Sequence, residues 1–546
     1  MLKYIGPSLE KYKGCDILDL NPGIGLWSRK LHEFLQPRSH VLLETSPELF
    51  REDLDPLLNN PGSKYKLYHG DIGRYETYDK LVEDGVFAHQ KRVDPKSPDA
   101  QKLNDTLLVT GSFMWDPNPA GFGFNSLPKQ LLLHFARRAW SNEAFHAYGP
   151  VRTLFWMPSE EFKTSMAKGQ NSVSKYGVYL DFLGKHTQVV SAGLSEKKPG
   201  RQSHGRAPQY EIESLVRAMR RGKENGMELP AHRRENVHDF ADELAEMSGG
   251  TGILNYSKIT EYLEDQERAG KSTSGLSLGT DIKAIHLDIA KEADPTKFRD
   301  PETGKVTPLD IKRQTYRSCR AHVRRYRIRT DTNVDMGESI YDLECKILKM
   351  QDGPKKETAL KELEELTESY ESIRERLLLY RTAAATDIDD RLSVRSPVPR
   401  LQWDDRPYEP LVMKPEEVWP AQGVALVDSE PHPRPEGYSP QIFEWIQDFV
   451  YALYQSPTRS VVKALNGMQP GASSLIDEVP ALKDPAKGGR LNMDQLRVRM
   501  LTKEMVMGLC MAYRAWPFRS PNAMHSKYFQ IRVGGDRTKK QLEHGY

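Results

Sequence analysis

Over residues 15–193, short apolar runs alternate with amphipathic stretches. The runs are rich in Val, Ile, Leu or aromatic residues and are bounded by Gly, Pro, Asp or Ser, which predicts strands. These runs are Cys15–Leu20, His40–Glu44, Tyr65–His69, Thr106–Thr110 and Arg152–Trp156. An apolar helix face extends from Trp27 to Leu35, and Lys129–Ser141 predicts a further helix. Alternating strands and helices predict an α/β fold with a mostly parallel sheet covered on both faces.

The rest of the chain lacks this alternation. The last part of the first domain, 1–193, includes VYLDFLGKHTQVVSAG at 178–193, which predicts an antiparallel hairpin at the end of the sheet. The first part of residues 194–396 is polar and basic and predicts a surface insert with one helix. The later part carries helical periodicity typical of a helical hairpin or short coiled coil. Residues 397–440 contain ten prolines, which predicts an extended linker. Apolar helical patterns return in 441–546 and predict a C-terminal helical domain.

Composition narrows the functional classes only a little. A chain of 546 residues is too long for a single hydrophobic core, which predicts more than one domain. Although 28% of the residues are charged, the net charge of +2 does not identify a partner. The four cysteines show no metal-ligand spacing and no disulfide framework, which favours a reducing compartment. No histidine pattern indicates a metal site either. No apolar run approaches the roughly 20 residues that span a bilayer, so membrane insertion is not expected. The first residues, MLKYIGPSLEKYKG, are too mixed to indicate a transit peptide.

The first predicted strand leads into DLNPGIG at 19–25, which opens a helix. Glycines at such a corner let the backbone approach a ligand, and the helix N-terminus offers unpaired N–H groups. Glu44 ends the next strand, where a carboxylate can accept ribose hydroxyls, and Asp71 ends the third strand, where it can reach an adenine amino group. Strand-end acids also occur as helix caps. The candidate ligand-binding residues are Asn21, Gly23, Gly25, Glu44 and Asp71.

This constellation resembles the class I S-adenosylmethionine-dependent methyltransferases and, more narrowly, the rRNA adenine N6-dimethyltransferase family. That family shows E-x-G-P-G-x-G, an acidic residue after the second strand, G-D, and then N-L-P-Y. The corresponding strings here are Asp19–Gly25, Glu44, Gly70-Asp71 and Thr110-Gly111-Ser112-Phe113. The resemblance implies a Rossmann-like fold, S-adenosylmethionine as cofactor, and a place for Thr110 in the cofactor pocket.

The fourth motif departs most from the family pattern. In the family, its Asn and a backbone carbonyl hold the target adenine amine, and its Tyr stacks on the flipped base. Thr110 cannot reproduce the paired hydrogen-bonding groups of an amide, whereas the ring of Phe113 could still stack. We therefore favour a buried strand and turn over a working active site, and expect methyl transfer to be reduced or lost.

One branch of the family fits better, the mitochondrial transcription factor B proteins. The string VRTLFWMPSEEFKTSMA at 151–167 resembles the fifth-strand segment of that branch, and LDLNPGIG and the eroded fourth motif are similar to it. The resemblance covers 15–193 well and 440–520 weakly, while 194–440 looks like a large insertion. It implies a factor that binds the single-subunit mitochondrial RNA polymerase, helps to melt the promoter and holds the separated strand.

A basic segment lies inside the insertion. Five arginines are spaced four, three, four and three residues apart, so on a helix they form one face: Arg313, Arg317, Arg320, Arg324 and Arg327. Three further cations widen this face: Lys312, Arg325 and Arg329. The face could track a phosphate backbone, with Tyr316 and Tyr326 stacking on exposed bases. The alternative is a solvated helix whose arginines pair with the acids of 338–376.

Three functions follow for testing. The preferred one is a transcription initiation factor of the mitochondrial matrix that binds promoter DNA or rRNA and mitochondrial RNA polymerase. The second is an active S-adenosylmethionine-dependent rRNA adenine N6,N6-dimethyltransferase of the small ribosomal subunit, which Glu44 and Asp71 support. The third is a non-catalytic scaffold associated with the mitochondrial ribosome, in which 194–440 is the working surface.

Overall fold

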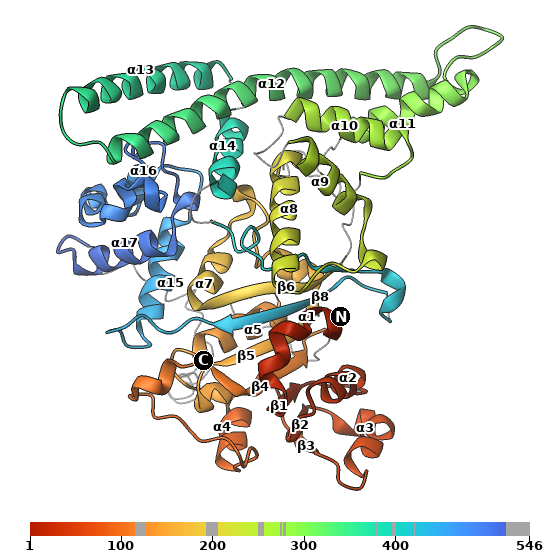
Figure 1. Cartoon of the computed structure of the whole chain (residues 1–546), viewed down its shortest axis with the longest axis vertical. Helices are drawn as coiled ribbons and strands as arrows, with labels where there is room; N and C mark the ends of the chain where they lie inside the picture. Colours follow the sequence, from red (N-terminus) through yellow and green to blue (C-terminus); the bar gives the residue numbers. More distant parts are fainter. Residues whose placement is uncertain are drawn as a thin grey trace, which may run out of the picture.

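The computed structural model contains an eight-stranded mixed sheet with the order β3-β2-β1-β4-β5-β8-β6-β7 (Figure 1). The structure describes residues 1–114, 126–192, 206–248, 256–273, 276, 280–377, 381–395, 400–419 and 421–519. The strands are β1 (Asp16–Leu20), β2 (Ser39–Glu44), β3 (Tyr65–His69), β4 (Asn104–Ser112), β5 (Val151–Pro158), β6 (Gly184–Ala192), β7 (Leu411–Met413) and β8 (Val424–Pro431).

The first five strands confirm the sequence prediction, with ends shifted by no more than two residues. Strand β1 pairs in parallel with β2 and β4, β2 pairs in parallel with β3, and β4 pairs in parallel with β5. Every residue of β1 and β2 is buried, as expected of parallel strands that have helices on both faces. The predicted α/β class is therefore confirmed.

Two sequence predictions at the end of the sheet are wrong. The expected hairpin at 178–193 is instead the end of helix α7 (Lys175–Leu183) followed by β6. The position beside β5 belongs to β8, which runs antiparallel to both β5 and β6 and comes from the segment 397–440 that was predicted to be a linker. Residues 424–427, VALV, are apolar and buried, so this strand fills the gap between β5 and β6.

The alternating side chains of the strands face two different layers. On one face, Ile17, Leu108 and Leu154 pack with apolar residues of α1 (Leu2–Leu9) and α2 (Leu26–Leu35). On the other face, Leu18, Val109 and Phe155 pack with the helices that follow β3, β4 and β5 and with the C-terminal helices. The remaining helices of this part are α3 (Arg51–Leu58), α4 (Tyr75–Glu83), α5 (Leu127–Arg138) and α6 (Ser159–Lys163).

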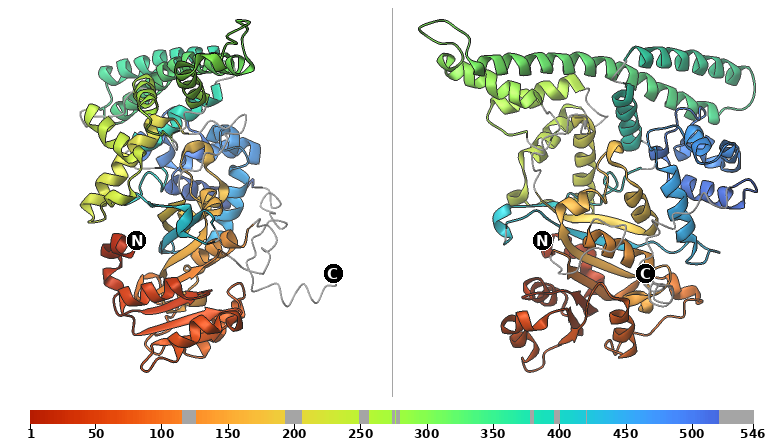
Figure 2. Two further views of the ribbon diagram at one scale, coloured as in Figure 1. Left: turned by 90° about the vertical axis from the view of Figure 1, so that its right-hand side faces the viewer. Right: turned by 180° about the vertical axis from the view of Figure 1, so that it is seen from behind.

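The inserted region is mainly helical and contains more order than the sequence predicted. Its first part, expected to hold one helix, forms two, α8 (Pro208–Glu224) and α9 (Asn236–Met247). The helices α10 (Tyr256–Arg268) and α11 (Thr280–Ala293) lead to α12 (Pro308–Leu348), whose 41 residues make it about 62 Å long. Figures 1 and 2 place α12 at the end of the molecule opposite β2 and β3.

The predicted helical hairpin is confirmed. Helix α13 (Pro354–Arg376) folds back along α12 after a turn at Gly353, and the Asn333 side chain donates a hydrogen bond to the Tyr370 carbonyl, 3.2 Å away. Gly337 of α12 lies where a Cβ atom would come within 3.0 Å of Ile388 on α14 (Arg381–Arg395), so the lack of a side chain lets the helices approach closely.

The C-terminal helices are fastened to the insertion by buried ion pairs. Helices α15 (Ile442–Leu453), α16 (Val461–Met468) and α17 (Lys503–Ala515) form this part, and the rings of Phe449 and Tyr513 lie 5.7 Å apart. Glu344 of α12 accepts a hydrogen bond from Arg490, at 2.7 Å. The hydrogen bond between Arg490 and Glu344 therefore anchors α12 to the C-terminal part of the chain. Among the helices described, we find none with the length and apolar character needed to cross a membrane.

Candidate functional site

The corner after β1 has the backbone shape that a glycine-rich turn would give. Asn21, Gly23 and Gly25 adopt positive φ angles of 50°, 55° and 72°. Asn is among the residues that tolerate the left-handed region, so Asn21 keeps the conformation that a glycine would take. Gly25 is the N-cap of α2, and a Cβ atom built on Gly23 would meet nothing within 4 Å. The corner therefore remains open for a ligand to approach the backbone.

Glu44 joins the ends of β1 and β2. Its Oε2 atom accepts a hydrogen bond from the Gly23 N–H at 3.2 Å, and Oε1 accepts from the N–H groups of Thr45 and Ser46 at 2.9 and 3.2 Å. The side chain is buried. A carboxylate offers about four lone-pair sites, so three backbone donors leave room for one further donor such as a hydroxyl.

Asp71 lies just beyond β3 on the same edge of the sheet. Its Oδ1 atom accepts from the Gly73 N–H at 2.8 Å, and Oδ2 lies 3.3 Å from Nε of Arg74. The Thr45 hydroxyl links the neighbouring loops, since it lies 3.3 Å from the Gly70 carbonyl and 3.5 Å from Oδ1 of Asn21. The structure thus brings Asn21, Gly23, Gly25, Glu44 and the loop of Asp71 to one edge.

Thr110 lies inside β4 and its hydroxyl group is already engaged. The Trp27 indole N–H donates to it at 2.7 Å, and the hydroxyl donates to the Leu154 carbonyl at 2.8 Å. The side chain is fully buried, and the Trp27 ring contacts Trp156 edge to face at 5.6 Å. Sequence reasoning assigned Trp27 to an apolar helix face and had no signal for this bond, because its partners are 83 residues apart.

Phe113 belongs to the core. It is 3% exposed, and its ring centroid lies 4.5 Å from that of Phe155. A base could reach its face only if the core opened. At the neighbouring Gly111, a Cβ atom would lie 2.5 Å from the Leu20 carbonyl oxygen, so β1 and β4 leave no space for a side chain there. The motif is a buried strand and turn, as the sequence favoured.

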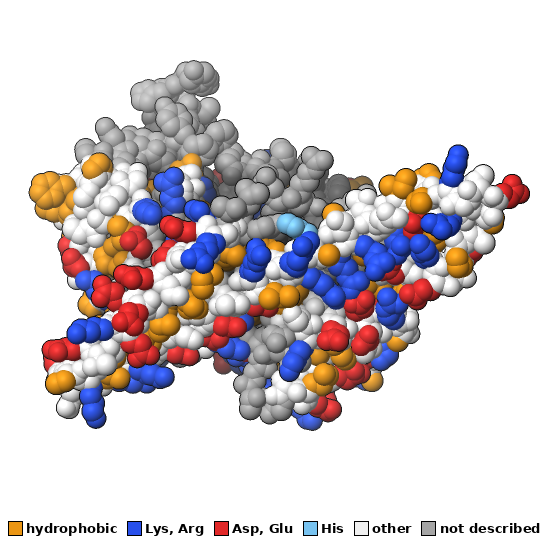
Figure 3. All heavy atoms as spheres, turned by 90° about the horizontal axis from the view of Figure 1, so that it is seen from above, with side chains coloured by type: hydrophobic (Ala, Val, Ile, Leu, Met, Phe, Trp, Pro, Cys, Tyr) orange, Lys and Arg blue, Asp and Glu red, His pale blue; other side chains and the backbone are white. Residues whose placement is uncertain are grey.

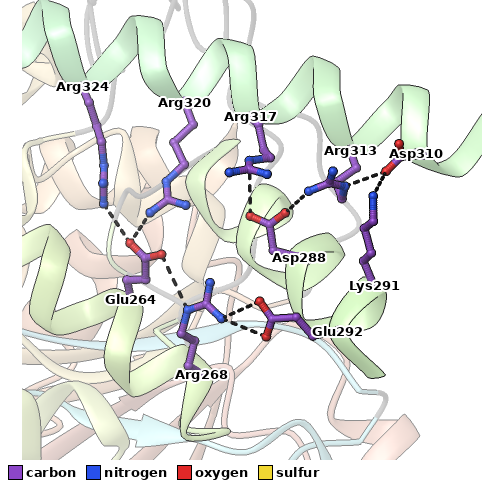
Figure 4. A network of polar contacts seen from close by, with 10 residues as sticks. All are labelled: Glu264, Arg268, Asp288, Lys291, Glu292, Asp310, Arg313, Arg317, Arg320 and Arg324. Carbon is purple, nitrogen blue, oxygen red and sulfur yellow. Dashed lines mark hydrogen bonds and ion pairs between the residues drawn. The ribbon is translucent and has the colours of Figure 1, made fainter. Parts of the chain in front are cut away.

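The predicted arginines do lie on one face of α12, but that face packs against other helices. Figure 4 shows Arg313, Arg317, Arg320 and Arg324 pointing toward α10 and α11. Arg313 donates to Asp288 at 2.7 Å and to Asp310 at 2.8 Å, and Arg317 lies 3.8 Å from Asp288. The hydrogen bond from Arg313 holds the pKa of Asp310 below its usual range. Most of this face is therefore neutralised within the insertion.

The other three arginines are paired in the same way. Arg320 and Arg324 both contact Glu264 of α10, and Arg327 pairs with Asp387 of α14 in a buried position. The alternative prediction placed the acidic partners in 338–376, and this assignment is wrong. Helices α10, α11 and α14 supply acids for all five arginines, and Asp310 of α12 is a second partner of Arg313. Tyr326 is 5% exposed, so it does not present a ring for stacking.

Comparison with known proteins relates part of this chain to one family model and to two yeast proteins. Residues 5–202 match the sequence model of the family described as ribosomal RNA adenine dimethylase. Mitochondrial transcription factor 1 of Saccharomyces cerevisiae is 28% identical over 186 residues, covering 33% of this chain and 48% of that protein. The protein of the same name from Saccharomyces paradoxus is 23% identical over 189 residues, covering 34% and 50%. The chain therefore spans about half the length of these relatives. A solved dimethyladenosine transferase from Plasmodium falciparum is 12% identical with a TM-score of 0.22, covering 49% of this chain and 95% of that one.

Proposed function

We propose, on the premise that residues 5–202 belong to the ribosomal RNA adenine dimethylase family, that this chain is a mitochondrial transcription initiation factor with a methyltransferase fold. In this role it acts in the mitochondrial matrix, binds promoter DNA and mitochondrial RNA polymerase, and assists promoter recognition and melting. The name that its yeast relatives share, mitochondrial transcription factor 1, supports this assignment.

The observation that carries the proposal is the state of the fourth motif. The Thr110 hydroxyl is held between the Trp27 indole and the Leu154 carbonyl, and Phe113 is buried against Phe155. Neither side chain can meet a flipped adenine without losing its present partners. The site therefore supports recognition of a nucleotide better than chemistry on a base.

The residues at the corner fit the adenosine part of S-adenosylmethionine. Glu44 retains capacity for a ribose hydroxyl, and the corner residues Asn21, Gly23 and Gly25 have the required positive φ angles. Asp71 would hold the adenine amine. When bound, the cofactor supplies an electrophilic methyl group. This chain orients the nucleoside, but the two side chains of its fourth motif, Thr110 and Phe113, are already engaged in the core.

The direct test is promoter opening by the mitochondrial RNA polymerase of the same organism. We expect thymines at the start site to become reactive toward permanganate in the presence of the polymerase only when this protein is also present. On a template whose start region is already mismatched and open, the requirement should disappear, which separates melting from later steps. Opening of the closed template to the same extent without the protein would contradict the proposal.

A second prediction concerns the cofactor. We expect S-adenosylmethionine to bind in a calorimetric titration and Glu44→Ala to weaken the affinity at least about tenfold, because a hydrogen bond to a charged group contributes roughly 1.5–3 kcal/mol. The control is Glu52→Ala, an exposed acid on α3. If the wild type did not bind S-adenosylmethionine, the cofactor prediction would be wrong, but the proposed role in transcription would not be affected.

The dimethyltransferase remains the second candidate because Glu44 and Asp71 stand at the ends of their strands as the family pattern requires. The measurement that separates the two is transfer of labelled methyl groups to unmodified small-subunit rRNA. We expect none. Incorporation that depends on Glu44 would establish the enzyme instead.

A further inference from the structure

We call the side of α12 that packs against α10 and α11 the inner face. The opposite side of α12 carries cations that the acids of α10 and α11 do not neutralise. We define this outer face by three exposed residues: Lys312, Arg325 and Arg329. Figure 3 shows Lys and Arg side chains in a row along this helix. We propose that the outer face of α12 binds the phosphate backbone of duplex DNA without reading its sequence. The inference rests on the proposed function for its choice of nucleic acid as the partner.

The first argument is the balance of charge. No Asp or Glu occurs between Ile311 and Thr330. The acids that do reach α12 in this region, Glu264 and Asp288, contact the inner face, where they hold Arg313, Arg320 and Arg324. Among the described contacts, Lys312, Arg325 and Arg329 have no ion pair, and Arg325 donates only to the backbone carbonyl of Ala321. The outer face therefore stays positive.

The second argument is shape and rigidity. Lys312 and Arg329 are seventeen positions apart, so the outer face extends for about 25 Å along the helix, comparable to about seven phosphates of one strand at 3.4 Å spacing. Small polar side chains such as Thr315 and Ser318 lie on the exposed surface between the cations and let a backbone come close. The inner ion pairs and Glu344–Arg490 hold α12 in place, so little conformational freedom is lost on binding.

The third argument selects duplex over single-stranded nucleic acid. Proteins that bind single strands without sequence preference combine a basic groove with aromatic rings on which bases stack. In the described part of this region, Tyr326 is buried and Tyr316 is half-buried beside Lys283, whose ammonium lies 5.9 Å from its ring. The outer face thus offers charge without an exposed aromatic platform, which suits contacts to phosphates alone.

The test is the salt dependence of DNA binding by the full chain. Fluorescence anisotropy with a labelled duplex of arbitrary sequence gives the slope of log affinity against log salt concentration. The triple variant Lys312→Gln, Arg325→Gln, Arg329→Gln should reduce that slope by about 2.7 and weaken binding roughly tenfold or more near 0.1 M salt, because each phosphate contact contributes about 0.9. The matched control removes three exposed lysines at the far, acid-rich end of the arm: Lys349→Gln, Lys355→Gln, Lys361→Gln.

The control should change the slope by less than about 0.9, the contribution of one contact. Three results would overturn the inference: no binding of duplex by the wild type, an unchanged slope in the triple variant, or tighter binding of a single strand than of the duplex. Circular dichroism verifies that both variants are folded. Because this assay contains no polymerase, a loss of duplex binding in the triple variant would support the surface even if promoter opening proved independent of the protein.

Discussion

Replacing Asp428 with Asn should lower the free energy of unfolding by about 3–5 kcal/mol, because it leaves the charge of Arg152 buried without its partner. Arg152 Nε donates to Oδ1 of Asp428 at 2.8 Å, and Nη2 approaches Oδ2 at 2.5 Å. The same guanidinium donates to the backbone carbonyl of Ser8 at 2.6 Å, so the pair ties β5, β8 and the end of α1 together. Urea unfolding followed by tryptophan fluorescence measures the change.

The matched control is Glu430→Gln on the same strand. Glu430 is exposed, and surface substitutions of this kind usually change stability by no more than about 0.5 kcal/mol. A small effect of Asp428→Asn, similar to that of the control, would mean that 424–431 is a dispensable segment rather than part of the sheet. The experiment therefore decides whether the sheet domain ends before the insertion or is completed after it.

The sequence predicted the parallel strands because each is a dense apolar run between turn residues, but β8 lacked that context. Only four consecutive apolar residues, 424–427, mark it, and the prolines around them indicated a linker. Its pairing is also non-local, since Phe155 lies opposite Val427. No local pattern can reveal a partner strand on the far side of an insertion. The prediction therefore assigned the antiparallel pairing to a hairpin at 178–193, whereas in the structure β8 provides it.

The candidate site was predictable in backbone and less so in side chains. Glycines and strand-end acids follow from local pattern, and Asn21, Glu44 and Asp71 do lie on one edge of the sheet. The enclosure of Thr110 by Trp27 depends on how α2 packs on β4, which spacing alone does not encode. The arginine face shows the same limit. The alternating spacing of four and three residues between the arginines identified a helix face correctly. The burial of that face by α10 and α11 depends on tertiary packing, which the spacing does not encode.

Asp389→Asn should be as destabilising as Asp428→Asn and should act on a different junction. Asp389 of α14 accepts hydrogen bonds from Arg497 and Arg499, both at 2.8 Å, and all three side chains are buried. Removing the carboxylate charge leaves two buried guanidinium groups without an anion, a change that costs about 3–5 kcal/mol for a single buried pair. Because these arginines belong to the C-terminal part, we expect the urea transition to begin earlier and trypsin to cleave near α14 sooner.

The control for this junction is Asp352→Asn. The Asp352 side chain is 95% exposed, and its carboxylate pairs with Lys356. Exposed ion pairs contribute about 0–1 kcal/mol, so stability and cleavage should hardly change. If Asp389→Asn behaved like this control, the insertion would be held to the C-terminal helices by apolar contacts alone. A large effect would instead show that three charged side chains fix the support of α12, and it would explain why a helix of 41 residues can present its outer face in one orientation.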